Sequence, residues 1–304
     1  MSNINKTISK KYAILSSIIV ILAVILVLTI LLKNRGYSLP TLKAINSNIS
    51  EIKINRGTNE TLSIKLNEGK WILNEEYIAD SDIIESMTNA LNLIKPVEII
   101  SRGEDDKEKY KLLDEELLTV IAIDNSLKEL RNIKFGMKAT LGNNVYAQID
   151  KDKNIYLLGN LSSNPKDIFD KREDDIINKT ISSIRNDKIN KITVSYNNKD
   201  YTLEKSESTN WLKVWNNSTV KVDDLYSPIY TIANFKADGL IRENLDKNLA
   251  LYKIEIFADN DFVLYEILNK NNNYEVSLSN DNNRYYINDA TFSNLKEAID
   301  NIIK

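Results

Sequence analysis

The chain has 304 residues, of which 42% are hydrophobic and 27% charged, and its formal net charge is −3. This length is enough for two ordinary domains, and the composition is typical of a folded protein rather than a disordered one. The sequence contains neither histidine nor cysteine. This excludes disulfides, Ser-His-Asp and Cys-His catalysis, and zinc sites built from the preferred ligands of that metal.

The first predicted element is an apolar helix. After Lys6, Lys10 and Lys11 the sequence runs AILSSIIVILAVILVLTILL over residues 13–32, without a charge, a glycine or a proline. At about 1.5 Å per residue this stretch spans about 30 Å, the thickness of the hydrocarbon core of a bilayer. We therefore expect a transmembrane helix over residues 13–32. The alternative is a cleaved signal peptide, whose apolar core is normally about 7–15 residues long and ends in small residues.

Charge predicts how this helix is oriented. The lysines and terminal amine before it outnumber Lys33 and Arg35 after it, and positive flanks stay in the cytoplasm. We expect a cytoplasmic segment over residues 1–12, contact with membrane lipid through the helix, a linker over residues 33–44 and an extracellular main domain. Because the first 36 residues carry only basic charges, the rest of the chain is net acidic, which disfavours binding to nucleic acid.

Beyond the linker, apolar residues alternate with polar ones. This period of two predicts an antiparallel hairpin whose buried face carries Ile52, Ile54, Leu62 and Ile64. Trp71 opens a third strand. Asp80 is then suited to cap a helix, in which apolar residues recur at helical spacing before Lys95 and Pro96 end it.

The same order of elements recurs later in the chain. A second hairpin is predicted with a buried face of Ile192, Val194, Tyr201 and Leu203. Trp211 follows Ile192 at the spacing at which Trp71 follows Ile52, and Asp223–Asp224 matches the step at Asp80. A helix is then expected with one apolar face, formed by Leu225, Ile229, Ile232 and Ala233.

The second halves of the two copies also correspond. Residues 117–136 resemble 249–268, and residues 144–158 resemble 273–287, each pair reading as two strands joined by a polar turn. A final amphipathic helix carries Phe292, Leu295, Ala298, Ile299 and Ile302 on one face. The predicted fold class is α+β: an N-terminal transmembrane helix and two tandem repeats of antiparallel sheet with packed helices, over residues 45–180 and 181–304.

This layout resembles a family of bacterial proteins with domain of unknown function 4340 (DUF4340). After the tryptophan and the step at Asp80, the resemblance is carried by Tyr110, Leu112, Leu113, Ile133, Phe135, Gly136, Tyr146 and Tyr156. The family has a glycine where this chain has Lys111, and no proline follows Asp114. The resemblance implies association with ABC-type export systems that have gliding-motility-type auxiliary subunits. It implies no reaction and no functional residues.

Several residues suit either a site or a structural role. Trp71 and Trp211 are expected to pack sheet against helix rather than stack on a ligand, and Trp215 is less well explained by packing. Asp150, Asp152 and Asn154 have the spacing of the first ligands of a calcium loop, but Ile155 and Leu161 stand where that loop needs glycine and glutamate. We therefore expect a hairpin turn there, and also at residues 259–261 and 280–283.

Acidic pairs are the remaining candidates for chemistry. Glu75–Glu76 and Asp223–Asp224 could act as acid and base if they lay across a cleft, although a helix cap already explains Asp223–Asp224. No phosphate-binding glycine loop occurs in the sequence. We therefore expect no catalytic, cofactor-binding or metal-binding residues.

The functional expectation is a membrane-anchored, extracytoplasmic and non-catalytic subunit of an ABC-type transport system, in contact with its permease or auxiliary subunits. The alternatives are a carboxylate-based extracytoplasmic hydrolase and a structural adapter of the cell envelope. The boundary between the two repeats is the default position for a ligand of unknown identity.

Overall fold

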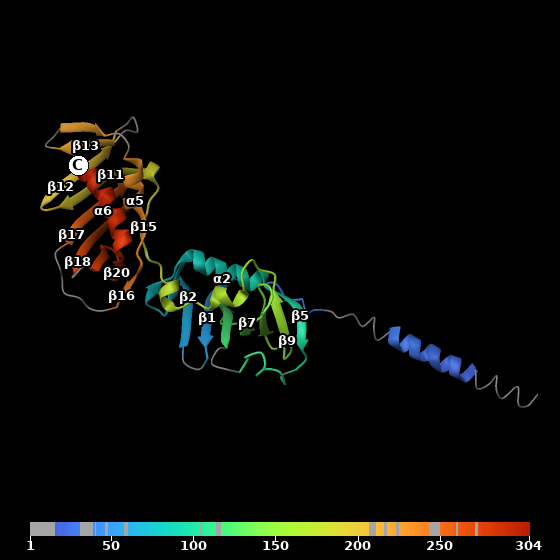
Figure 1. Ribbon diagram of the computed structural model, residues 1–304. Helices are drawn as coiled ribbons and strands as arrows, with labels where there is room; N and C mark the ends of the chain where they lie inside the picture. The colour runs from blue at the N-terminus through green and yellow to red at the C-terminus, as the bar shows by residue number, and fades with distance from the viewer. Residues whose placement is uncertain are drawn as a thin grey trace, which may run out of the picture.

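The computed structural model describes residues 16–30, 39, 41–45, 48–57, 60–103, 105–113, 117–206, 211–215, 218–222, 225–242, 250–259, 261–270 and 273–304. Two nine-stranded antiparallel sheets dominate it, each with its own hydrophobic core. Figure 1 shows the two sheets as neighbouring units, the first in blue to green and the second in yellow to red.

The first unit is the sheet with the order β4-β3-β2-β1-β6-β7-β8-β9-β5 and its helices. Helix α2 (Ser81–Leu93) connects β4 at one edge of the sheet with β5 at the other edge, so it crosses the whole sheet (Figure 1). Short helices α3 (Pro165–Phe169) and α4 (Glu173–Ile176) follow the last strand. The strands are β1 (Ile49–Arg56), β2 (Glu60–Asn67), β3 (Lys70–Leu73), β4 (Tyr77–Ile78), β5 (Lys95–Ser101), β6 (Leu118–Asp124), β7 (Glu129–Lys138), β8 (Val145–Ile149) and β9 (Ile155–Gly159).

The second unit begins with β10 (Thr180–Ser183) and the 3-10 turn η1 (Asn186–Lys188), and ends with α6 (Asp289–Ile303). Its sheet has the order β14-β13-β12-β11-β17-β18-β19-β20-β16, which repeats the connectivity of the first. Helix α5 (Tyr226–Ala233) takes the place of α2, and β15 (Asn234–Lys236) leaves it to pair with β10. The strands of the sheet are β11 (Ile189–Tyr196), β12 (Lys199–Lys205), β13 (Trp211–Trp215), β14 (Ser218–Val222), β16 (Gly239–Ile241), β17 (Ala250–Ala258), β18 (Phe262–Lys270), β19 (Asn273–Leu278) and β20 (Arg284–Ile287).

The predicted hairpins are confirmed by the strand register. Ile52 lies opposite Ile64 in the first unit, and Ile192 lies opposite Leu203 in the second. All four side chains are buried, because alternate residues of a strand face the same side of a sheet. The predicted cap of α2 is also confirmed, since the Asp80 side chain accepts a hydrogen bond from the N–H of Asp82.

The fold class requires a correction. The expected α+β class is wrong, because the described chain is mostly β and is organised by two large sheets. The period-two pattern extends through most of each unit, whereas only α2, α5 and α6 carry an apolar helical face with several buried residues. These helices cover sheets and do not form a layer comparable to them in size.

The expected transmembrane helix requires a second correction. The structure has a short helix over residues 16–30, and residues 13–15 and 31–32 of the expected span lie outside the described residues. Within the described part of the chain, no helix is long and apolar enough to cross a membrane. The expected cytoplasmic segment over residues 1–12 also lies outside the described residues.

The turn between β6 and β7 generates a stability prediction. Leu127 adopts a left-handed backbone conformation, with φ at 63°, and its side chain is 83% exposed. Leucine pays about 1–2 kcal/mol for this conformation, and glycine does not, although glycine loses more chain entropy on folding. Leu127→Gly should therefore raise the free energy of unfolding by about 0.5–1 kcal/mol, measured by denaturant titration.

Leu127→Ala is the matched control, because it removes the exposed side chain and keeps the strained backbone. It should leave the free energy of unfolding unchanged within about 0.5 kcal/mol. Equal stabilisation by both substitutions would show that the exposed leucine, and not the backbone, limits stability at this turn.

Candidate functional site

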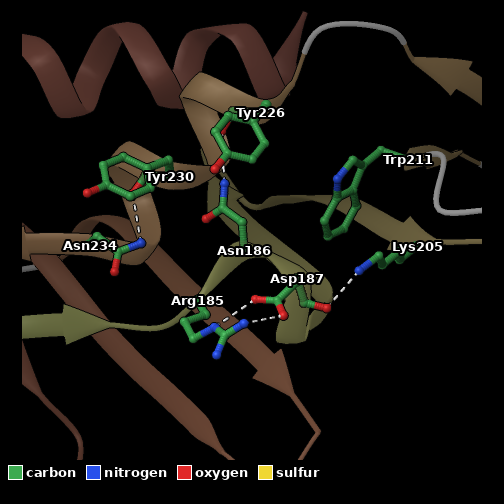
Figure 2. Close-up of a pocket in the computed structure, with 8 residues that line it drawn as sticks. All are labelled: Arg185, Asn186, Asp187, Lys205, Trp211, Tyr226, Tyr230 and Asn234. Carbon is green, nitrogen blue, oxygen red and sulfur yellow. Dashed lines mark hydrogen bonds and ion pairs between the residues drawn. The ribbon is translucent and has the colours of Figure 1, made fainter.

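The second unit contains a cavity of about 510 Å³, which lies beside η1, α5 and the strands β12 and β13. Figure 2 shows the side chains around it, which come from η1, β12, β13, α5 and the start of β15. The lining residues are Arg185, Asn186, Asp187, Lys205, Trp211, Tyr226, Tyr230 and Asn234. A volume of this size lies within the range of about 300–1,000 Å³ that is usual for small-ligand sites.

Helix α5 supplies two aromatic rings to the cavity. Ile229, Ile232 and Ala233 bury one face of this helix against the core. Tyr226 and Tyr230 lie one helical turn apart on another face and are 70% and 54% exposed. Both rings therefore present apolar surface to solvent, and the packing of the helix does not require them.

The end of α5 is fixed by hydrogen bonds to its last carbonyl groups. The Tyr265 hydroxyl donates to the carbonyl of Ile232 (3.0 Å), and the Ser182 hydroxyl donates to that of Ala233 (2.7 Å). The Asn234 side chain donates to the carbonyl of Ile184 (2.8 Å). Burial raises the pKa of Tyr265 far above its usual range, so its hydroxyl stays protonated and keeps donating. The carbonyls of Ile232 and Ala233, which helix geometry leaves free at the end of α5, are thereby satisfied.

The opposite wall of the cavity is formed by neighbouring strands. Trp211 on β13 lies opposite Lys205 on β12, so both side chains stand together. The Lys205 ammonium donates to the carbonyl of Asp187 (2.8 Å), which ties this wall to η1 (Figure 2). Trp211 is also partly buried against the second core. Its predicted packing role is confirmed, and its side chain also lines the cavity.

The polar side chains of the cavity are already organised, with Arg185 and Asp187 78% and 56% exposed. Arg185 donates two hydrogen bonds to the Asp187 carboxylate (3.0 and 2.8 Å), and these bonds hold the pKa of Asp187 below its usual range. The Asn186 amide donates to the carbonyl of Tyr226 (3.1 Å), whereas its Oδ1 atom is buried without a hydrogen-bond partner. An acceptor in this state is costly unless a donor reaches it.

This arrangement is suited to binding rather than to acid–base chemistry. Among the described residues that line the cavity, Asp187 is the one carboxylate, and hydrogen bonds from Arg185 hold its pKa below the usual range. The three aromatic rings were not predicted as a group. The spacing of Tyr226 and Tyr230 was a usable signal, because two tyrosines one turn apart opposite an apolar face are exposed by the geometry of the helix.

The calcium-like sequence at residues 150–154 forms the predicted turn. Asp150 accepts from the N–H of Asn132 and pairs with Arg131 (3.0 Å). Asp152 accepts from the N–H of Asn154 (2.9 Å) and from the Tyr156 hydroxyl (2.5 Å). These oxygens already have partners inside the protein. Across the described residues, no group of three acidic side chains is placed to hold a metal ion.

The second unit repeats this turn in atomic detail. Asp281 accepts from the N–H of Asn283 (2.9 Å) and from the Tyr285 hydroxyl (2.6 Å). The shared pattern is therefore an aspartate, an asparagine two positions later and a tyrosine two positions after that. In the other predicted turn, Asp259 pairs with Lys188 (3.0 Å), and Asn260 lies outside the described residues.

Of the two acidic pairs, the structure describes Glu75–Glu76. Glu75 and Glu76 occupy the exposed turn between β3 and β4, and the hydrogen bond from Lys65 lowers the pKa of Glu75. A general acid at neutral pH needs the opposite shift. Asp223 and Asp224 lie outside the described residues, as does the side chain of Trp215. Trp71 packs against the first core, as predicted.

The boundary between the units, where a ligand was expected by default, is held by ion pairs. Lys236 of the second unit contacts Asp80 of the first (2.9 Å), and Arg242 contacts Glu173 (3.1 Å). Leu240 packs against both cores. Burial raises the pKa of Asp80, but hydrogen bonds from Lys236 and a backbone N–H outweigh it, so the pKa is lowered overall. The cavity of Figure 2 lies within the second unit instead.

The repeated turn generates a stability prediction. Tyr156→Phe and Tyr285→Phe each remove a hydroxyl that donates to a carboxylate, and hydrogen bonds to charged groups contribute about 1.5–3 kcal/mol. We expect each substitution to lower the free energy of unfolding by about 1–2 kcal/mol, because water reaches the freed carboxylate. Tyr230→Phe is the control, since its ring is exposed, and should change the free energy by less than about 0.5 kcal/mol. Losses no larger than that of the control would contradict the role of these hydroxyls.

Comparison with known proteins identifies the family. No curated protein and no solved structure matches the chain significantly. The model of the family described as domain of unknown function (DUF4340) matches residues 71–253, well over half of the chain. The structure explains two glycine positions of the resemblance. Lys111 stands where the family has glycine, and its φ of 54° is a conformation that glycine favours. Gly136 has no room for a side chain, because a Cβ there would lie 2.1 Å from the carbonyl oxygen of Tyr110. The chain belongs to the DUF4340 family.

Proposed function

We propose that this protein is a non-catalytic binding subunit of an ABC-type transport system, working outside the cytoplasm. The observation that carries the binding role is the cavity of the second unit. There, Trp211, Tyr226 and Tyr230 surround polar groups that are already held in place. A rigid set of aromatic and polar groups favours binding, because little conformational freedom is lost when a ligand arrives.

The transport link rests on a different support. Membership of the DUF4340 family is shown, and the resemblance of this layout to proteins that accompany gliding-motility-type ABC systems supplies the rest. The sequence has no phosphate-binding glycine loop. In this proposal, ATP hydrolysis therefore belongs to another subunit, and this chain contributes recognition.

A non-catalytic role is favoured over a carboxylate hydrolase. The two buried carboxylates, Glu51 and Glu275, belong to different sheets. Glu51 accepts from the Ser63 hydroxyl (2.9 Å), and Glu275 faces Arg284 (3.6 Å). A glycosidase-type reaction needs two carboxyl groups about 5–10 Å apart around one bond, whereas the described lining of the cavity in Figure 2 includes one carboxylate, Asp187.

Co-purification tests the proposal. The full chain, carrying an affinity tag, is expressed in its native cells, cross-linked and purified in mild detergent beside an untagged strain. We expect recovery of an ABC permease or an auxiliary subunit only from the tagged strain. The transport role would be contradicted if neither protein were recovered, or if the same proteins were recovered from the tagged and the untagged strain. Protease is also added to cells whose outer layers are permeable and whose cytoplasmic membrane is intact. It should cleave the chain, whereas full protection of the chain would contradict the proposed location.

A further inference from the structure

We infer that the cavity lined by Trp211, Tyr226 and Tyr230 is a saccharide-binding site for a neutral, polyhydroxylated ring. This inference rests on the binding role proposed above and specifies its ligand class. A sugar ring has two kinds of surface, a face of C–H groups and a rim of hydroxyls. The cavity presents a matching surface to each of them.

The aromatic walls match the C–H face. Tyr226 and Tyr230 expose more than half of their surface, and Trp211 stands on the opposite wall (Figure 2). Flat rings of this kind lose little conformational entropy on binding and gain from covering apolar surface. Because α5 is packed through other residues, these two tyrosines are free to serve a ligand without a cost to the fold.

The polar side chains match the hydroxyl rim. The Asp187 side chain is 56% exposed, and its carboxylate oxygens can accept more hydrogen bonds than the two from Arg185. A sugar hydroxyl can donate to this carboxylate. Arg185 holds the Asp187 carboxylate through two of its five N–H groups, so its remaining N–H groups can donate to sugar oxygens.

Charge and chemistry disfavour other small ligands. Arg185 and Lys205 are offset in part by Asp187, and both cations already have partners, so the cavity has no strong attraction for an anion. The same cations disfavour a positively charged ligand. A purely apolar ligand would remove water from the Arg185–Asp187 pair and Asn186 without replacing their hydrogen bonds, which is costly.

A proline-rich peptide is the closest competitor, because such peptides dock on aromatic grooves. Proline has no N–H group, so a polyproline segment could not donate to the Asp187 carboxylate, as a sugar hydroxyl can. These observations favour the saccharide.

Binding to defined sugars tests the inference. The purified full chain is titrated by calorimetry with neutral oligosaccharides, namely tetramers of β-1,4-linked glucose, β-1,4-linked N-acetylglucosamine, α-1,4-linked glucose and α-1,6-linked mannose. Decaproline and oligogalacturonate serve as a peptide and an anionic comparison. We expect saturable binding of at least one neutral sugar, and weaker binding of both comparison ligands.

Variants then place the sugar in the cavity. The double variant Tyr226→Ala/Tyr230→Ala should weaken binding at least about tenfold, whereas Tyr226→Phe/Tyr230→Phe keeps both rings and should stay within about threefold. Phe262→Ala removes an aromatic residue of the same unit that is 49% exposed outside the cavity, and should leave the affinity unchanged. Circular dichroism confirms that each variant is folded.

Three results would overturn the inference: no saturable binding of any neutral sugar in the panel, tighter binding of decaproline or oligogalacturonate, or full affinity in the double alanine variant. Failure here is separable from failure of the transport role, because co-purification is measured independently. Recovery of the transporter without sugar binding would reject only the ligand class. Sugar binding without recovery of a transporter would reject only the transport link.

Discussion

The central strand pairs of the two sheets are the constraint on which the rest of the structure depends. Strand β1 lies between β2 and β6, and β11 lies between β12 and β17. Their inward side chains, including Ile52 and Ile192, are fully buried. A slip of one residue would turn every one of these side chains toward solvent. The register is therefore fixed by burial, and each further hairpin adds to a frame whose position is already determined.

The candidate site follows from this frame. In the first unit, α2 alone connects the two edges of the sheet. In the second unit, α5 is shorter than α2 and is followed by β15, which pairs with β10. The end of α5 is consequently held by Tyr265 and Ser182, which belong to β18 and β10. A helix held in this way can carry two tyrosines on its outer face at little cost to stability. These two tyrosines line the cavity of the second unit.

Local features of the structure could be predicted from the sequence. The hairpin around Ile52 and Ile64 and the cap at Asp80 depend on neighbouring residues, and their periodicity and side-chain chemistry are visible in the chain. The turns at Asp152 and Asp281 were also predicted, although not the tyrosine that completes each of them. The α+β class failed because three helical stretches were given the same weight as many short strands. The expected membrane span is overturned, because no helix within the described residues is long and apolar enough to cross a membrane.

Features that join distant segments could not be predicted. The sequence does not show that β5 and β16 are edge strands of their sheets. Their positions depend on how many strands the segment between β4 and β5, or between β14 and β16, crosses. The cavity has the same origin, because Arg185, Lys205 and Tyr226 come from three separate segments. Each of them alone reads as an ordinary surface residue. The hydrogen bonds that join η1 to α5 and to Lys205 on β12 bring them to one place.

Occupancy of the cavity in living cells tests the central claim, that the second unit presents a ligand site, most directly. The photoreactive residue p-benzoylphenylalanine is placed at position 230 in one strain and at position 262 in another, and both strains are irradiated. The account predicts a covalent adduct at position 230, on the cavity, and none at position 262, which lies outside it. No adduct at position 230, or equal adducts at both positions, would contradict the claim that this cavity binds a ligand.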